Sequence, residues 1–118
     1  MLRDGVSNTA WEKGMPFLEV VREAARKRLL FLPHAIDQMN RPERMISPRE
    51  VREVIFSGQL IEDYPEDPRG HSCLLSGLTH LNRIIHVVCS PKDAYLAIIS
   101  AYVPEPDRWE ENFTRRRR

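Results

Sequence analysis

Cysteine is scarce in this chain: 118 residues contain only Cys73 and Cys89. Two cysteines this far apart in sequence are too few for a disulfide framework or a zinc ribbon, so we expect free thiols in a reducing compartment, the cytoplasm of a bacterium-like cell. Long hydrophobic runs are missing as well. The longest, Leu29–Leu32, falls far short of the roughly 20 residues that cross a membrane, which predicts a protein without a membrane partner.

The strong catalytic motifs are also absent. The sequence has no phosphate-binding GxxxxGK run, no GxGxxG, no nucleophile elbow and no pair of CxxC units. His71 and Cys73 have the spacing of two metal ligands, but no second pair completes a tetrahedral site. We therefore expect neither a metal nor a cofactor, and any chemistry must come from ordinary side chains.

Excess charge of one sign is missing from the body of the chain. The net charge is +1, yet four of the 18 basic residues are the final Arg115–Arg118, and the other 14 face 17 acidic residues, a balance of −3. This argues against a broad nucleic-acid-binding face, which needs a positive excess, but leaves room for a compact site. We interpret residues 114–118 as a solvated arginine tail, with contact to nucleic acid or an acidic partner as the alternative.

What is present fits one domain with one hydrophobic core. We expect a flexible lead-in over residues 1–15 and a single domain over residues 16–113. Apolar residues on one side predict an amphipathic helix from Pro16 that ends before Pro33, followed by a short helix at 34–39.

The clearest helix signal lies at residues 47–57. Ser47 and Glu50 fit a capping box at its start, and Gly58 suits a left-handed stop at its end. Four runs rich in strand formers follow, separated by turns too short for parallel crossovers. They are Gln59–Tyr64, Ser72–Leu78, Arg83–Ser90 and Tyr95–Val103. The sequence therefore predicts an α+β fold, with two or three N-terminal helices on one face of a four-stranded antiparallel sheet.

Candidate site residues are those that move protons or bind phosphate. Histidine titrates near neutral pH, tyrosine donates hydrogen bonds or stacks on a base, and arginine holds phosphate with two hydrogen bonds. The candidates are His34, His86 and Tyr102 for catalysis, and Tyr64, Arg69 and Arg83 for substrate binding. Each also has an ordinary structural interpretation, such as a buried core histidine for His86 or a solvated cation for the arginines.

Four segments in combination resemble a family of uncharacterised bacterial domains: FLPHAIDQM at 31–39, the stretch from Ile46 to Gly77, RIIHVVCS at 83–90, and AIISAYVPEPDRWEENF at 97–113. That family is similar in layout to the BrnT-like and RelE/ParE-like toxins of bacterial toxin–antitoxin pairs. The resemblance implies the toxin component of such a pair, an endoribonuclease that works without a metal, with a small antitoxin-like protein as its partner. It carries over no catalytic residue, so the candidate site rests on residue chemistry alone. The alternative is a non-catalytic protein-interaction module with the same fold.

Overall fold

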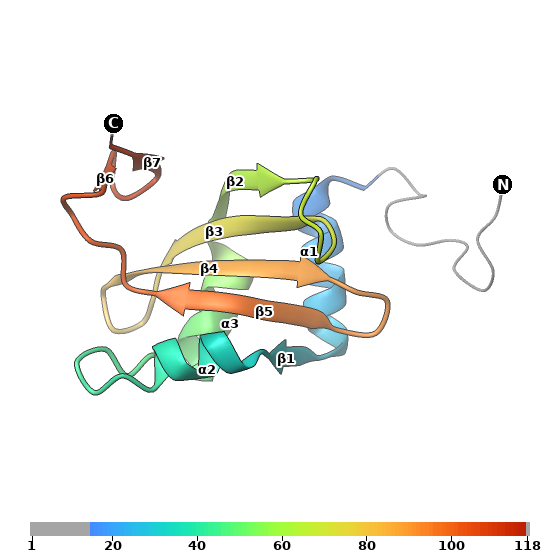
Figure 1. The fold of residues 1–118 in the computed structure, drawn as a ribbon, viewed down its shortest axis with the longest axis horizontal. Coiled ribbons are helices and arrows are strands. Elements are labelled where there is room, and N and C mark those ends of the chain that lie inside the picture. The colour runs from blue at the N-terminus through green and yellow to red at the C-terminus, as the bar shows by residue number, and fades with distance from the viewer. Residues whose placement is uncertain (1–14, 118) are drawn as a thin grey trace, which may run out of the picture.

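The computed structural model describes residues 15–117, so nearly all of the predicted lead-in lies outside the described part of the chain. Three helices and two sheets make up the fold (Figure 1). The helices are α1 (Phe17–Lys27), α2 (Pro33–Met39) and α3 (Pro48–Ser57). The strands are β1 (Leu29–Phe31), β2 (Gln59–Tyr64), β3 (Ser72–Leu78), β4 (Ile84–Pro91), β5 (Leu96–Tyr102), β6 (Trp109–Glu110) and β7 (Arg115–Arg116). Between residues 15 and 117, no helix combines the length and apolar character that a membrane crossing needs.

The main sheet has the order β1-β5-β4-β3-β2. Strands β2 to β5 form the predicted antiparallel meander, so the α+β class is confirmed. The predicted count of four strands is wrong, because Leu29–Phe31 leaves the expected helix and pairs in parallel with β5. The Arg28 carbonyl accepts from the Leu96 amide at 2.8 Å, and this pairing replaces the hydrogen bonds that another helical turn would supply.

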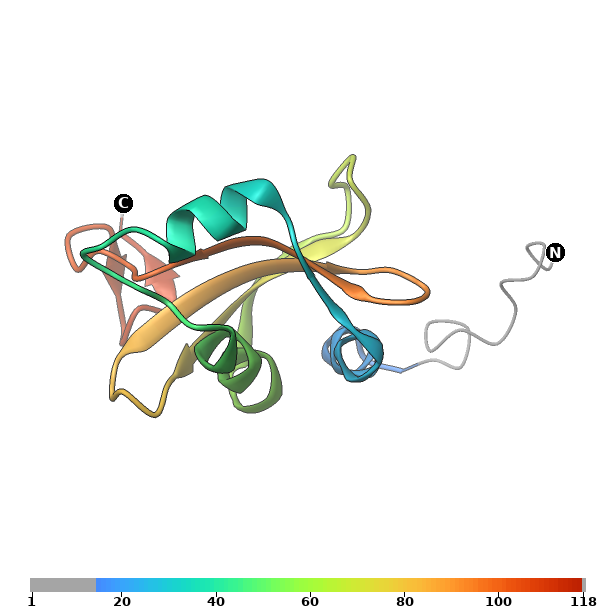
Figure 2. The ribbon, with the colours of Figure 1, turned by 90° about the horizontal axis from the view of Figure 1, so that it is seen from below.

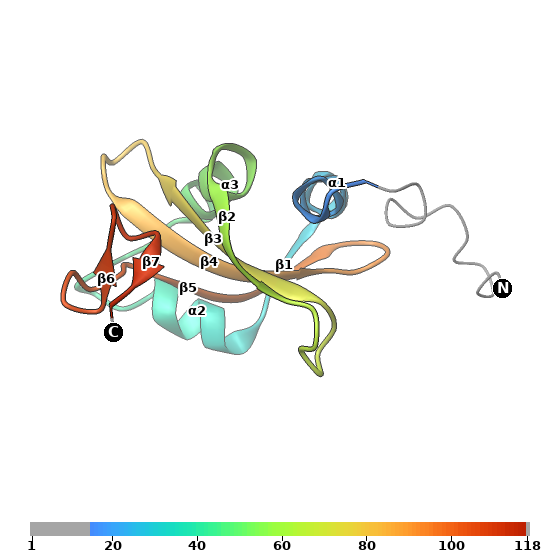
Figure 3. The same ribbon diagram turned by 90° about the horizontal axis from the view of Figure 1, so that it is seen from above.

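The helices lie on both faces of the sheet, not on one as predicted. Helices α1 and α3 cover one face, and α2 lies on the opposite side against β5 (Figures 2 and 3). The Gln38 side chain of α2 accepts from the Ser100 hydroxyl at 2.7 Å and the Ala101 amide at 2.9 Å, which fixes α2 to β5. The core between α1, α3 and the sheet includes Val21 and Ile55, both fully buried.

Helix α3 begins as predicted and ends for a different reason. The Glu50 amide donates to Ser47 Oγ at 3.1 Å and the Ser47 amide donates to Glu50 Oε1 at 3.2 Å, which completes the capping box. Gly58 is not a left-handed stop, because its φ is −83°. A Cβ there would lie 2.5 Å from the carbonyl oxygens of both Val54 and Ser76. Glycine is needed for the close approach of α3 to β3.

The two cysteines face each other across β3 and β4. Cys73 and Cys89 are register partners, both fully buried, with their Sγ atoms 4.0 Å apart and both thiols free. The hydrogen bond with Cys73 and the burial raise the pKa of the Cys89 thiol well above its ordinary value, so it stays protonated at neutral pH.

Candidate functional site

The centre of the candidate site is His86, in the middle of β4. Its side chain is fully buried, and both ring nitrogens have partners: Nε2 lies 2.7 Å from the Phe113 carbonyl oxygen and Nδ1 lies 3.3 Å from the Tyr102 hydroxyl. A carbonyl oxygen can only accept, so Nε2 carries the hydrogen and Nδ1 accepts from Tyr102. The Trp109 ring lies edge-on to the imidazole, with 4.5 Å between ring centroids.

Both members of this hydrogen-bonded pair are uncharged at neutral pH. Burial lowers the pKa of His86 from 6.5 to about 4, so the imidazole stays neutral. Burial also raises the pKa of Tyr102, so its phenol keeps its proton. Tyr102 therefore donates a hydrogen bond to the neutral His86 imidazole, which orients its hydroxyl.

A charged pair lies next to these residues. Arg116 of β7 donates from Nε to Glu62 Oε2 at 2.7 Å and from Nη2 to Oε1 at 3.0 Å, and the Tyr64 hydroxyl donates to the same carboxylate. The Arg116 guanidinium lies 4.7 Å from the Trp109 ring centroid, a cation–π contact. The charges of Glu62 and Arg116 act on both His86 and Tyr102, so the four form one electrostatic unit.

The ionised form of Glu62 is favoured. Burial opposes ionisation, but the hydrogen bonds from Arg116 and Tyr64 outweigh it and lower the pKa of Glu62. Burial and the hydrogen bond to Glu62 raise the pKa of Tyr64 to about 12. At neutral pH the cluster therefore holds one carboxylate, one guanidinium and two protonated phenols. We use the name His86 cluster for Glu62, Tyr64, His86, Tyr102, Trp109 and Arg116.

Of the six candidates from the sequence, the structure brings together His86, Tyr102 and Tyr64. His34 is exposed in the first turn of α2. Within the described residues, its side chain makes no contact with the His86 cluster. Arg69 lies in the loop between β2 and β3, where Asp67 accepts from its Nε at 3.0 Å and from its Nη2 at 2.9 Å.

Arg83 lies apart from the cluster and binds a buried carboxylate. Its Nε donates to Glu50 Oε2 and its Nη2 to Glu50 Oε1, both at 2.8 Å, while Nη1 donates to the Arg44 carbonyl. The Thr79 hydroxyl also donates to Glu50, which is fully buried at the start of α3. The hydrogen bond from Arg83, partly offset by burial, lowers the pKa of Glu50 to about 2. Arg83 thus joins β4 to the start of α3.

Three members of the cluster were missed by sequence reasoning: Glu62, Trp109 and Arg116. Glu62 and Tyr64 are two residues apart on one strand and so share a face, a signal that was available. Arg116 gave no local signal. It was expected to lie in a solvated tail, whereas the structure pairs it with Glu62 and places Arg115 at 2.9 Å from Glu110.

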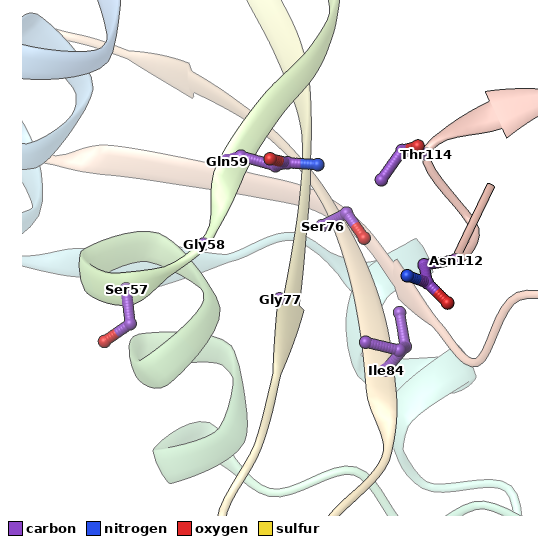
Figure 4. A pocket seen from close by; sticks show the side chains of 8 residues that line it. All are labelled: Ser57, Gly58, Gln59, Ser76, Gly77, Ile84, Asn112 and Thr114. Atoms are coloured by element: carbon purple, nitrogen blue, oxygen red, sulfur yellow. The ribbon is translucent and has the colours of Figure 1, made fainter.

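A hollow of about 250 Å³ lies beside the cluster, which we call the polar hollow (Figure 4). It lies close to His86 because Ser76 is the register partner of His86, and because Asn112 and Thr114 flank Phe113, the residue that accepts from His86. The lining residues are Ser57, Gly58, Gln59, Ser76, Gly77, Ile84, Asn112 and Thr114.

A second hollow, of about 220 Å³, lies near α2, β1 and the start of α3. We call it the apolar hollow, and its lining residues are Phe31, Ile36, Met39, Asn40, Ile46 and Pro48. Among residues 15–117, no group of three or more histidine, cysteine, aspartate or glutamate side chains is placed to hold a metal ion.

Comparison with known proteins gives one positive result. A family model, described as a domain of unknown function (DUF4258), matches residues 31–103. No curated protein and no solved structure matches the chain, and nothing in these comparisons links it to BrnT-like or RelE/ParE-like toxins. The matched segment runs from the last residue of β1 past the end of β5, so it includes Glu62, His86 and Tyr102 but not the β6–β7 hairpin. More than half of the chain is covered, and the chain therefore belongs to the DUF4258 family.

Proposed function

We propose that this protein is a metal-independent endoribonuclease that cleaves single-stranded RNA at the His86 cluster. The observation that carries the proposal is that a carboxylate and a guanidinium, Glu62 and Arg116, pair with each other and act electrostatically on a protonated phenol, Tyr102. RNA brings its own nucleophile, the 2′-hydroxyl, so cleavage needs only a base, an acid and a positive charge.

Each role follows from the protonation state of the group. The ionised Glu62 accepts the proton of the 2′-hydroxyl as its oxygen bonds to phosphorus. Tyr102 gives its proton to the 5′-oxygen as the phosphorus–oxygen bond breaks, which leaves a cyclic phosphate and a free 5′-hydroxyl. Arg116 stabilises the charge on the phosphoryl oxygens. Glu62 and Arg116 are accessible for this, with 22% and 59% of their side chains exposed.

In this proposal His86 is a positioning residue and not a proton carrier, because it is fully buried. It accepts the hydrogen bond of Tyr102 and is itself held by the Phe113 carbonyl. His86→Gln should therefore lower the rate at every pH, without shifting the pH profile toward the ordinary titration range of histidine.

The test is cleavage of a fluorescent single-stranded RNA in the presence of a chelator. Glu62→Gln, Tyr102→Phe and Arg116→Ala should each lower the rate by about 10² to 10⁴-fold. Arg69→Ala is the matched control, because it also removes an exposed arginine from an ion pair, and it should keep full activity. Thermal melting checks folding. Absence of cleavage by the wild-type protein, or full activity in all three variants, would contradict the proposal.

A second candidate function, a protein-interaction module, is favoured by the apolar hollow. Ile36 at its rim is 43% exposed and the nearby Met45 is 61% exposed, both large hydrophobic side chains. Phe31 lines the same hollow from β1, an edge strand that has no neighbouring strand on its outer side among residues 15–117 and could pair there with an added strand. We propose this surface for the small antitoxin-like partner, in preference to the arginine tail, whose Arg115 and Arg116 already have partners.

The partner proposal is tested by purifying the tagged protein from its native host and looking for a second small protein. The two proteins should co-purify, and Ile36→Asp should abolish co-purification while Glu66→Ala, an exposed change in the loop between β2 and β3, should not. A wild-type protein that purifies alone, at high yield and without toxicity to the host, would refute it.

A further inference from the structure

We propose that the polar hollow binds one unpaired base of an RNA strand and so determines where the strand is cut. This inference rests on the proposed ribonuclease function and adds a specificity site to it. The hollow lies beside the His86 cluster. Its lining residue Ser76 is the register partner of His86 across β3 and β4, and Asn112 and Thr114 flank Phe113, whose carbonyl accepts a hydrogen bond from His86.

The lining of the hollow matches the chemistry of a base and not that of a phosphate. No lining residue is charged, and two are amides, Gln59 from β2 and Asn112 from the β6–β7 loop. Figure 4 shows the two amide side chains reaching toward the hollow from different elements, with Ser76 between them. Each amide has an NH₂ group that donates and a carbonyl oxygen that accepts, so it can form a pair of hydrogen bonds with the edge of a base.

Ser76 adds a hydroxyl to the lining of the hollow. The residue as a whole is only 4% exposed, but its hydroxyl is not cut off from water, because no buried side-chain oxygen within residues 15–117 lacks a hydrogen-bond partner. Figure 4 shows this side chain directed into the hollow. A base that enters the hollow would exchange water at this hydroxyl for a hydrogen bond of its own.

The surroundings of the hollow suit a nucleotide as a whole. Ile84 offers an aliphatic surface on which the face of a base can pack. Thr114, at the other side, is followed directly by Arg115 and Arg116, which form ion pairs with Glu110 and Glu62, so two charged pairs adjoin a neutral hollow. A base in the hollow would leave its phosphates next to these arginines, with Arg116 already placed within the His86 cluster.

The experiment uses the full chain and a short single-stranded RNA with 2′-O-methyl groups, which cannot be cleaved. Its addition should shift the side-chain amide NMR signals of Gln59 and Asn112. Gln59→Ala and Asn112→Gly should each weaken binding about tenfold, a loss within the range measured for an amide–base pair. Glycine is used at position 112 because Asn112 has a φ of 59°. Asn40→Ala, which removes an amide from the apolar hollow, is the matched control and should leave binding unchanged.

A second arm replaces each base in turn with an abasic site. At one position the abasic RNA should bind about tenfold more weakly to the wild-type protein, and Gln59→Ala should cause no further loss with that RNA. Unmoved amide signals, or equal binding of every abasic RNA, would overturn the base site even if RNA is cleaved. Shifted amide signals without any cleavage would support the base site and refute the ribonuclease.

Discussion

The buried histidine makes the stability of the fold depend on pH in a defined direction. His86 has a pKa of about 4 when folded and about 6.5 when exposed. As the pH falls below 6.5, the unfolded chain takes up a proton that the folded chain excludes until about pH 4. The free energy of unfolding therefore falls as the pH is lowered through this interval, and the contribution of His86 is fully present only above pH 6.5.

The size of the effect follows from the two pKa values. One pKa unit corresponds to about 1.36 kcal/mol, so the complete displacement is worth about 3 kcal/mol. Between pH 7 and pH 5 the unfolded histidine becomes almost fully protonated while the folded one remains neutral, which gives a loss of about 2 kcal/mol. The charged groups that act on His86 are Glu62 and Arg116. Both keep their charge over this range, because the Glu62 pKa is lowered and the Arg116 pKa is raised.

The assay is urea unfolding of the wild-type protein and of His86→Gln at pH 7 and pH 5. Glutamine can still donate to the Phe113 carbonyl but does not titrate, so the variant should lose about 2 kcal/mol less than the wild type between the two pH values. His34, His71 and His80 are present in both proteins and their contributions cancel in the comparison. The reasoning is refuted if the two proteins lose the same stability.

Two further predictions concern the packing of α3. Arg83→Ala leaves the buried Glu50 carboxylate without its cation and should lower the free energy of unfolding by about 3 kcal/mol. The measurement is urea unfolding at pH 7, and a loss below about 1 kcal/mol would show that the pair is dispensable. Gly58→Ala places a Cβ 2.5 Å from the carbonyl oxygens of Val54 and Ser76 and should cost about 1–3 kcal/mol, a loss that an exposed Ser57→Ala should not reproduce.

The elements that the sequence predicts well are those whose signals are local. Two strands, Gln59–Tyr64 and Ser72–Leu78, have the predicted bounds because alternating side chains end at proline, glycine or asparagine turns. Strand β1 was missed because Leu29–Phe31 continues the apolar period of α1, and leucine favours a helix more than a strand. Its strand conformation depends on hydrogen bonds to β5, which no local pattern encodes.

The candidate site, too, contains residues that the sequence predicts and residues whose contacts depend on tertiary structure. His86 and Tyr102 were chosen for their chemistry, and they meet because the β4–β5 register places them opposite each other. Arg69 and Arg83 have the same chemistry, but which carboxylate each arginine meets depends on loops and helix packing. Arg116 joins the cluster because the β6–β7 hairpin pairs it with Trp109, a contact decided by tertiary structure.

The parallel pairing of β1 also bears on the order in which the chain assembles. Residues Leu29–Phe31 are synthesised early, yet their partners Leu96–Ile98 follow only after α2, α3 and three further strands. On the ribosome, β1 cannot pair until β5 has been synthesised, whereas the β2–β3 and β3–β4 hairpins join strands that follow each other in the chain. Because a long loop must close to bring β1 to β5, we expect this edge to form late in folding and to open first under denaturant.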